Sequence, residues 1–122
     1  MPRKKSGFII GISSVAGDRG RKKNYIYGSA KAGFTEYLSG LRNRLFESNV
    51  HVMTVKPGFV DTHMTENMEL PKRLTAQPDE VAEDIYRSWT KKKNVIYTKR
   101  IWGIIMLVIK HIPEFMFKKT DI

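Results

Sequence analysis

The order of apolar patterns along the chain predicts an α/β fold with a parallel sheet. Three short apolar runs lie at residues 8–12, 50–55 and 94–98, and a helical or apolar segment follows each of them. Alternation of strands and helices is typical of sheets whose consecutive strands run parallel and are joined by right-handed crossovers. The sequence therefore predicts a parallel sheet of about three strands with flanking helices.

The first run, Phe-Ile-Ile-Gly-Ile at 8–12, is continuously apolar, which is typical of a strand buried on both faces. Residues 15–24 are rich in glycine and charge and predict a loop. Apolar residues then recur at intervals of three and four, which predicts a helix over 25–47 that Asn49 ends in a left-handed conformation. The residues of this periodic stripe are Tyr27, Ala30, Phe34, Leu38, Leu41 and Leu45.

The second half of the chain repeats the alternation. The β-branched run at 50–55 predicts a strand that Pro57 and Gly58 close, and 59–76 predicts a loop with short helical pieces. Pro78 suits the first turn of a helix that has acidic residues early and Lys91 to Lys93 at its end. A strand at 94–98 and an apolar helix at 101–117, broken near Pro113, complete the prediction.

Composition limits the class of protein. The 122 residues suit one domain, and the chain has no cysteine, which excludes disulfide scaffolds, zinc–thiolate sites and cysteine nucleophiles and suits a reducing compartment such as the cytoplasm. The three histidines are scattered without metal-type spacing, so no metal site is predicted. No apolar run approaches the ~18–20 residues that a membrane-spanning helix needs, and the N-terminus does not resemble a secretory signal.

The chain is strongly basic, with 22 Lys and Arg against 12 Asp and Glu and a formal net charge of +10. Such a charge suits nucleic acid, an anionic membrane surface or simply a solvated face. The basic clusters lie apart in the sequence and lack interleaved aromatic residues, so nucleic-acid binding is the weakest of these hypotheses and no nucleic-acid partner is predicted.

Ser14, Tyr27 and Lys31 are the candidate catalytic residues. Tyr27 and Lys31 are four apart on the predicted helix and share one face, and Ser14 follows the first strand, where α/β sheets place their ligand crevice. A phenol is a weak acid at neutral pH, but a nearby ammonium group stabilises its ionised form. A Tyr–Lys pair at this spacing is usually only a solvated pair, but here Lys31 lies within the apolar stripe, where a lysine without a task would be costly. The three groups together suit proton transfer to or from an alcohol or carbonyl.

The chain resembles the short-chain dehydrogenase/reductase family in three blocks. They are residues 12–17 (Ile-Ser-Ser-Val-Ala-Gly), 27–33 (Tyr-Gly-Ser-Ala-Lys-Ala-Gly) and 55–62 (Val-Lys-Pro-Gly-Phe-Val-Asp-Thr). The spacing of thirteen positions between Ser14 and Tyr27 matches the family pattern, in which Ser13 would be a structural neighbour. The resemblance covers nearly all of residues 1–122 but only the C-terminal portion of the family's single NAD(P)-binding domain, and it implies a partial Rossmann-type sheet.

The resemblance implies a role for each matching residue. Tyr27 would be the general acid and base, and Ser14 would orient the substrate carbonyl. Lys31 would stabilise the phenolate of Tyr27 and hydrogen-bond the nicotinamide ribose, so Tyr27 and Lys31 would both contact the cofactor. The remaining cofactor-binding residues would be Pro57, Gly58, Val60 and Thr62, with a substrate lid after Thr62.

The implied function is NAD(P)-dependent interconversion of an alcohol and a carbonyl, with a slight preference for NADP, in a cytoplasmic homo-oligomer. The family's Gly-rich turn, which seats the pyrophosphate, and its Asn-Ala-Gly segment have no match here, so the chain is expected to be incomplete as an enzyme.

The C-terminal helix predicted over 101–119, apolar and then basic, resembles a branch of the family with lipid-linked sugar substrates, that of the reductase component of decaprenylphosphoryl-ribose 2-epimerase. The substrate would then be a small or lipid-linked alcohol or carbonyl, and the protein would contact the inner face of the membrane peripherally. The other interpretation is that Trp102, Ile105, Leu107 and Ile109 cover the sheet or a subunit interface. An alternative to the enzyme as a whole is a non-catalytic remnant that binds a membrane surface or a protein partner through this region.

Overall fold

The computed structural model describes residues 6–60 and 74–121. Its main sheet has three strands, β1 (Gly7–Ile12), β2 (Val50–Pro57) and β5 (Val95–Thr98), in the order β1-β2-β5. Both neighbouring pairs are parallel, with Gly11 opposite Thr54 and Lys56 opposite Tyr97. The prediction of a parallel α/β sheet with flanking helices is confirmed.

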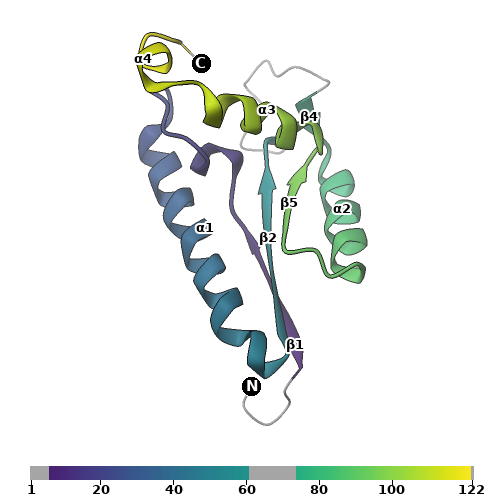
Figure 1. Ribbon diagram of the computed structural model, residues 1–122. Coiled ribbons are helices and arrows are strands. Elements are labelled where there is room, and N and C mark those ends of the chain that lie inside the picture. The colour runs from purple at the N-terminus through teal and green to yellow at the C-terminus, as the bar shows by residue number, and fades with distance from the viewer. Residues whose placement is uncertain (1–5, 61–73, 122) are drawn as a thin grey trace.

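Helices cover both faces of this sheet (Figure 1). Helix α1 (Tyr25–Leu45) lies against one face and α2 (Pro78–Thr90) against the other. Helix α3 (Ile101–His111) crosses the carboxyl ends of the strands and leads into the short α4 (Glu114–Phe117). No helix in the described ranges is long and apolar enough to cross a bilayer.

Several element boundaries differ from the sequence predictions. The loop after β1 contains a 3₁₀ helix, η1 (Val15–Gly17), and α1 ends at Leu45 before a second 3₁₀ helix, η2 (Phe46–Ser48). The left-handed end at Asn49 is confirmed, with φ 58°. Strand β2 runs two residues further than predicted, because the backbone of Lys56 and Pro57 still pairs with β5.

The predicted loop at 59–76 contains two short parallel strands, β3 (Phe59–Val60) and β4 (Thr75–Ala76), at the edges of the segment 61–73, which lies outside the described residues. The apolar C-terminal segment is broken at Pro113 as predicted, since α3 ends at His111 and α4 begins at Glu114. The start of α2 also matches, because Pro78 opens the helix behind a capping box formed by Gln77 and Glu80.

Strand β2 is buried on both faces because its side chains alternate between two helices. Met53 and Val55 point to one face, where they pack with Ile96 and with Ile85 and Trp89 of α2. The opposite face receives α1, whose Leu38 is 2% exposed and packs so closely that a Cβ on Gly11 would lie 2.4 Å from it. Burial on both faces explains why apolar side chains occupy both alternating sets of positions in β2, with Val52 on one face and Met53 and Val55 on the other.

Arg42 of α1 fixes the helix to the same face of the sheet. Its Nε donates to the Val52 carbonyl oxygen at 2.8 Å, and its Nη2 donates to Thr54 Oγ1 at 2.7 Å and to the Asn94 carbonyl oxygen at 3.0 Å. Burial lowers the pKa of Arg42 from its ordinary value. The predicted stripe of α1 is covered only in its second half: Leu38, Leu41 and Leu45 are buried or half-buried, whereas Tyr27, Ala30 and Phe34 are exposed.

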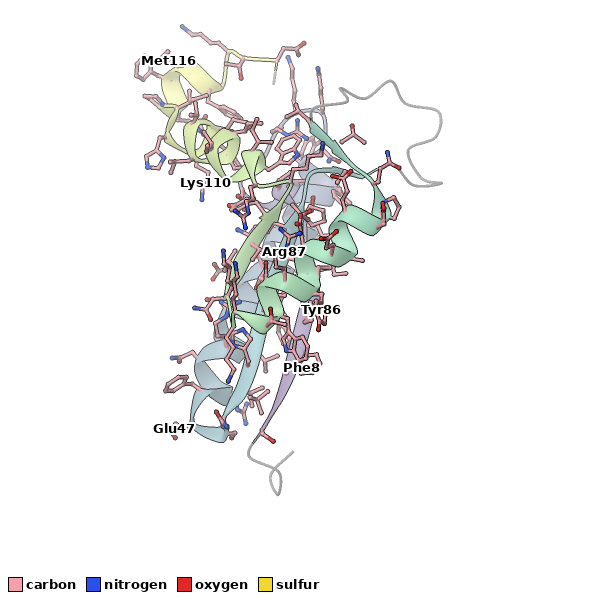
Figure 2. The ribbon with its side chains drawn as sticks, turned by 90° about the vertical axis from the view of Figure 1, so that its right-hand side faces the viewer. Phe8, Glu47, Tyr86, Arg87, Lys110 and Met116 are labelled. Carbon is pink, nitrogen blue, oxygen red and sulfur yellow. The ribbon has the colours of Figure 1, made fainter. Side chains whose placement is uncertain are left out.

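The exposed edge of β1 predicts that the isolated chain associates with itself. In the described sheet β1 pairs with β2 alone, and Phe8 and Ile12 are 49% and 52% exposed. Figure 2 shows Phe8 beside α2, on the side that carries Tyr86. An open strand edge flanked by apolar side chains is a template for edge-to-edge pairing.

The net charge of +10 opposes this association, but salt screens it to within about 8 Å near physiological ionic strength. We therefore expect the apparent mass of the purified chain to rise with salt in a light-scattering series. A sharply melting monomer at every ionic strength would contradict the prediction.

Candidate active site

Ser14 lies at the carboxyl end of β1, where it begins η1 as its N-cap residue. Its side-chain Oγ accepts a hydrogen bond from the backbone N–H of Ala16 at 3.1 Å, and the residue is 8% exposed. This bond uses a lone pair of the hydroxyl and leaves its hydrogen to be donated. Ser14 is therefore held in one orientation and can donate to a substrate oxygen.

Ser13 has a different environment from its neighbour. Its hydroxyl donates to the Lys31 carbonyl oxygen at 3.0 Å and lies 2.6 Å from Thr35 Oγ1, and its backbone N–H donates to the Val55 carbonyl oxygen at 2.7 Å. These bonds join the loop after β1 to α1 and to β2. Ser13 thus has contacts that suit the structural role expected of it.

Two glycines let this loop approach α1 closely. A Cβ on Gly28 would lie 2.6 Å from the Ala16 carbonyl oxygen, and a Cβ on Gly17 would lie 2.7 Å from the backbone nitrogen of Ala32 and 2.8 Å from the carbonyl carbon of Lys31. Backbone atoms cannot move aside as a side-chain tip can, so any larger residue would separate the two elements. The close approach places the Ser14 turn against the segment of α1 that carries Tyr27 and Lys31.

Tyr27 and Lys31 share one face of α1, as the sequence predicts. The Lys31 Nζ lies 5.6 Å from the centroid of the Tyr27 ring. Tyr27 is 47% exposed and Lys31 is half-buried, so both side chains border solvent at the sheet's carboxyl end. The structure therefore brings Tyr27 and Lys31 together, whereas Ser14 bonds to Ala16 and shares no hydrogen bond with Tyr27.

Pro57 and Gly58 end β2 at the same edge of the sheet. Pro57 lies opposite Thr98, and the Gly58 N–H donates to the Thr98 carbonyl oxygen at 3.1 Å. A Cβ on Gly58 would lie 2.1 Å from the indole of Trp102, so α3 packs directly onto this turn. Of the other two residues expected to bind a cofactor, Val60 belongs to β3 and Thr62 lies outside the described residues, as does the expected lid.

The structure adds a buried polar network that sequence reasoning missed. Asp18, which ends η1, accepts from Lys56 Nζ at 2.8 Å through Oδ1 and from the Tyr97 hydroxyl at 2.5 Å through Oδ2. The Asp18 and Lys56 side chains are 3% and 10% exposed. Burial, together with the adjacent Asp18 carboxylate, raises the pKa of Tyr97 above its ordinary value. A sequence signal did exist, because Lys56 directly follows the apolar run at 50–55 and a lysine that is buried there needs a partner.

Arg19, next to Asp18, ties the same loop to the C-terminal helices. Its Nη1 donates to the carbonyl oxygens of Ile109 at 2.7 Å and Ile112 at 2.6 Å, at the end of α3. The guanidinium also lies 3.8 Å from the centroid of the Phe117 ring. A cation at a helix C-terminus satisfies free carbonyl groups and favours the helix dipole, so Arg19 holds α3 and α4 over the carboxyl end of the sheet.

The raised pKa of Tyr97 predicts a pH dependence of stability. The folded protein retains the Tyr97 proton at pH values at which the unfolded chain has lost it, so the free energy of unfolding should fall as the pH rises above about 10. In Tyr97→Phe this contribution is absent, and the alkaline decline should be shallower. Urea unfolding at a series of alkaline pH values measures how the free energy of unfolding of wild type and of Tyr97→Phe depends on pH. An equal dependence in the two proteins would contradict the prediction.

A parallel sheet with helices on both faces, with a serine turn and a Tyr–Lys pair at its carboxyl edge, defines a domain of Rossmann type. The short chain dehydrogenase family model matches residues 1–73. The chain belongs to the short-chain dehydrogenase family. The catalytic and cofactor-binding roles of individual residues stay predictions.

Two uncharacterised oxidoreductases are similar to most of this chain. An uncharacterised oxidoreductase of Mycobacterium tuberculosis is 35% identical over 113 residues, which cover 93% of this chain and 45% of the relative. An uncharacterised oxidoreductase of Streptomyces coelicolor is 31% identical over 113 residues, covering 93% of this chain and 44% of the relative. The chain thus spans about half the length of the curated relatives it matches.

Solved structures share the fold. A short-chain dehydrogenase from Burkholderia cenocepacia in complex with NADP has a TM-score of 0.78 at 20% identity, covering 91% of this chain and 46% of its own. A short-chain dehydrogenase from Sphingobium yanoikuyae in complex with NADPH has a TM-score of 0.68 at 20% identity, and the match covers 92% of this chain and 48% of that protein. The comparisons do not support the alternative of a non-catalytic remnant.

Proposed function

We propose that these residues form the catalytic and nicotinamide-binding portion of an NAD(P)-dependent oxidoreductase that interconverts an alcohol and a carbonyl. The observation that carries the proposal is the docking of the Ser14 turn onto α1 beside Tyr27 and Lys31 through Gly17 and Gly28. This contact gathers a hydroxyl donor, a phenol and an ammonium group at the carboxyl edge of a parallel sheet, where such folds bind ligands.

The residues present fit the nicotinamide end of a dinucleotide. Lys31 and Tyr27 offer donors for ribose hydroxyls from a face that borders solvent, and Pro57 and Gly58 end β2 at the same edge. When bound, the nicotinamide accepts or supplies the hydride. NADP is the favoured form, in line with the NADP and NADPH named for two proteins of the same fold.

The chain's own groups account for the proton. In the oxidation direction, the Tyr27 oxygen as phenolate takes the hydroxyl proton of the alcohol, and in the reduction direction the Tyr27 phenol returns it to the carbonyl oxygen. Lys31, with Nζ 5.6 Å from the ring centroid, provides positive charge that stabilises the phenolate. The Ser14 hydroxyl donates to the same substrate oxygen and holds it in place.

The isolated chain should have little or no activity, because no Gly-rich turn in its sequence receives the pyrophosphate. The test therefore compares two polypeptides, the chain alone and a fusion of the N-terminal half of the M. tuberculosis relative to residues 1–122. We expect calorimetry to show NADPH binding by the fusion only, and the fusion to oxidise or reduce members of an alcohol and ketone panel. Micromolar NADPH binding by the chain alone would contradict the expected difference between the two polypeptides. A folded fusion that neither binds NADPH nor turns over would overturn the proposed function.

We also propose that α3 contacts an anionic membrane surface. The helix is apolar on two sides: Trp102 and Met106 are buried toward the sheet, whereas Ile104, Leu107 and Val108 are 68%, 55% and 60% exposed. Figure 2 shows Lys110 and Met116 at the end of the molecule opposite Glu47. An exposed apolar stripe beside lysines suits a lipid surface. Because the Leu107 side chain is exposed, it does not cover the sheet.

Flotation with vesicles tests this contact. The protein should float with anionic vesicles and less with neutral ones, and Leu107→Ser should weaken the binding. Equal recovery of wild type and Leu107→Ser with anionic vesicles would contradict the proposal. The homo-oligomer, the cytoplasmic location and the lipid-linked substrate stay predictions.

A further inference from the structure

The buried pair of Asp18 and Lys56 stands out because its charges are far from solvent. The Asp18 side chain is 3% exposed and that of Lys56 is 10% exposed, and their atoms lie 2.8 Å apart. Both Asp18 oxygens are used, since the second accepts from the Tyr97 hydroxyl at 2.5 Å. The Lys56 Nζ also lies 5.3 Å from the centroid of the Tyr97 ring. The three side chains form one closed polar unit, here called the Asp18 network.

This network connects three segments at the carboxyl edge of the sheet. Asp18 ends the turn that Ser14 begins, and its N–H donates to the Val15 carbonyl oxygen at 3.0 Å. Lys56 immediately precedes Pro57 in β2, and Tyr97 lies opposite Lys56 in β5. Asp18 and Lys56 are thus within a few residues of groups that the proposed function uses, and Tyr97 joins them from β5, yet none of the three is a candidate to touch the reacting atoms.

We propose that Asp18 is a positioning residue, which through Lys56 and Tyr97 sets the Ser14 turn relative to the Pro57–Gly58 segment. The inference rests on the proposed function, because Ser14 would hold the substrate and Pro57 and Gly58 would border the nicotinamide. A shift of about 1 Å between such groups can lower a rate by roughly 10²-fold. Fixing their separation is therefore a specific task for a rigid link.

Stability alone is a poor reason for this arrangement. Burying an ion pair costs desolvation energy, and well-packed apolar side chains of similar volume are often at least as stable. The apolar route is open to this fold, since Val52 and Val55 of the same strand are fully buried. Hydrogen bonds are directional, whereas apolar contacts are not. The two bonds that Asp18 accepts therefore fix its position relative to β2 and β5 at once.

The inference is tested by removing all the polar side-chain atoms of the Asp18 network together. The triple variant Asp18→Leu/Lys56→Met/Tyr97→Phe replaces the network with apolar groups in the fusion described above. We expect its melting temperature to stay within a few degrees of wild type, whereas kcat/KM falls by about 10- to 100-fold with a raised KM for NADP. A purely structural role would lower the amount of folded enzyme, and hence Vmax, but would leave KM unchanged.

Two further variants keep the test decisive. Tyr97→Phe removes one hydrogen bond only, and it should raise KM for NADP even if the triple variant does not fold. Asp121→Asn is the matched control, because Asp121 also pairs with a lysine, at 2.6 Å from Lys22 Nζ, but is exposed; its kinetics should equal those of wild type. If the wild-type fusion is active and either the triple variant or Tyr97→Phe retains the wild-type KM and kcat, the inference is wrong. The proposed function then still stands. A folded wild-type fusion that neither binds NADPH nor turns over overturns the inference together with the proposed function.

Discussion

Tyr27→Phe is expected to lower kcat of the active fusion by about 10²- to 10⁴-fold, the usual contribution of a general acid or base. The substitution removes only the hydroxyl group, so the ring and its contact with Lys31, whose Nζ is 5.6 Å from the ring centroid, remain. The variant loses one proposed donor to the ribose but keeps Lys31, so the affinity for NADP should fall far less than kcat. Steady-state kinetics and calorimetry on the same preparations measure the two effects.

The matched control is Tyr25→Phe. Tyr25 begins the same helix, is 61% exposed and has no assigned task, so its loss should leave kcat unchanged. Lys31→Met should lower kcat and also weaken NADP binding, because Lys31 is proposed to serve both Tyr27 and the ribose. Near-normal turnover by Tyr27→Phe would remove it from the proposed mechanism.

The fold was predictable because its main signals are local in sequence. The apolar runs of β1, β2 and β5 and the period of α1 depend on residues a few positions apart. The Tyr27–Lys31 contact is equally local, since one turn of helix places the two side chains on the same face. The role of Ser14 came from a family spacing, and the structure adds the buried N-cap geometry that holds its hydroxyl.

The Asp18 network was not predictable in this way. Asp18 is 38 positions from Lys56 and 79 from Tyr97, so no periodicity connects them, and the loop that holds Asp18 looks like any charged surface turn. Arg19 is similar, because its acceptors on α3 and beyond lie 90 and 93 positions away. Contacts of this kind depend on how the loop after β1 meets the ends of the other strands, which only the folded arrangement determines.

The close approach of two backbones was likewise hidden in the sequence. Gly28 and Gly40 both belong to α1, and the helical period of the sequence does not show which of them meets another backbone. In the structure a Cβ on Gly28 would lie 2.6 Å from the Ala16 carbonyl oxygen, whereas a Cβ on Gly40 would meet nothing within 4 Å. The same substitution at the two sites should therefore have opposite effects.

Gly40→Ala is expected to stabilise the protein by about 0.5–1 kcal/mol, because alanine loses less backbone entropy in a helix. Gly28→Ala gains the same helix propensity but must move the η1 turn, and overpacking of this kind costs about 1–3 kcal/mol.

Urea unfolding of the two variants measures the difference in stability, and kinetics of the corresponding fusions measure its consequence. Because the turn that must move carries Ser14, Gly28→Ala should also lower kcat/KM, while Gly40→Ala should not. If Gly28→Ala were as stable and as active as Gly40→Ala, the Ser14 turn would not depend on close packing against α1. The site would then have to be held by the Ser13 hydrogen bonds to Lys31 and Thr35 instead.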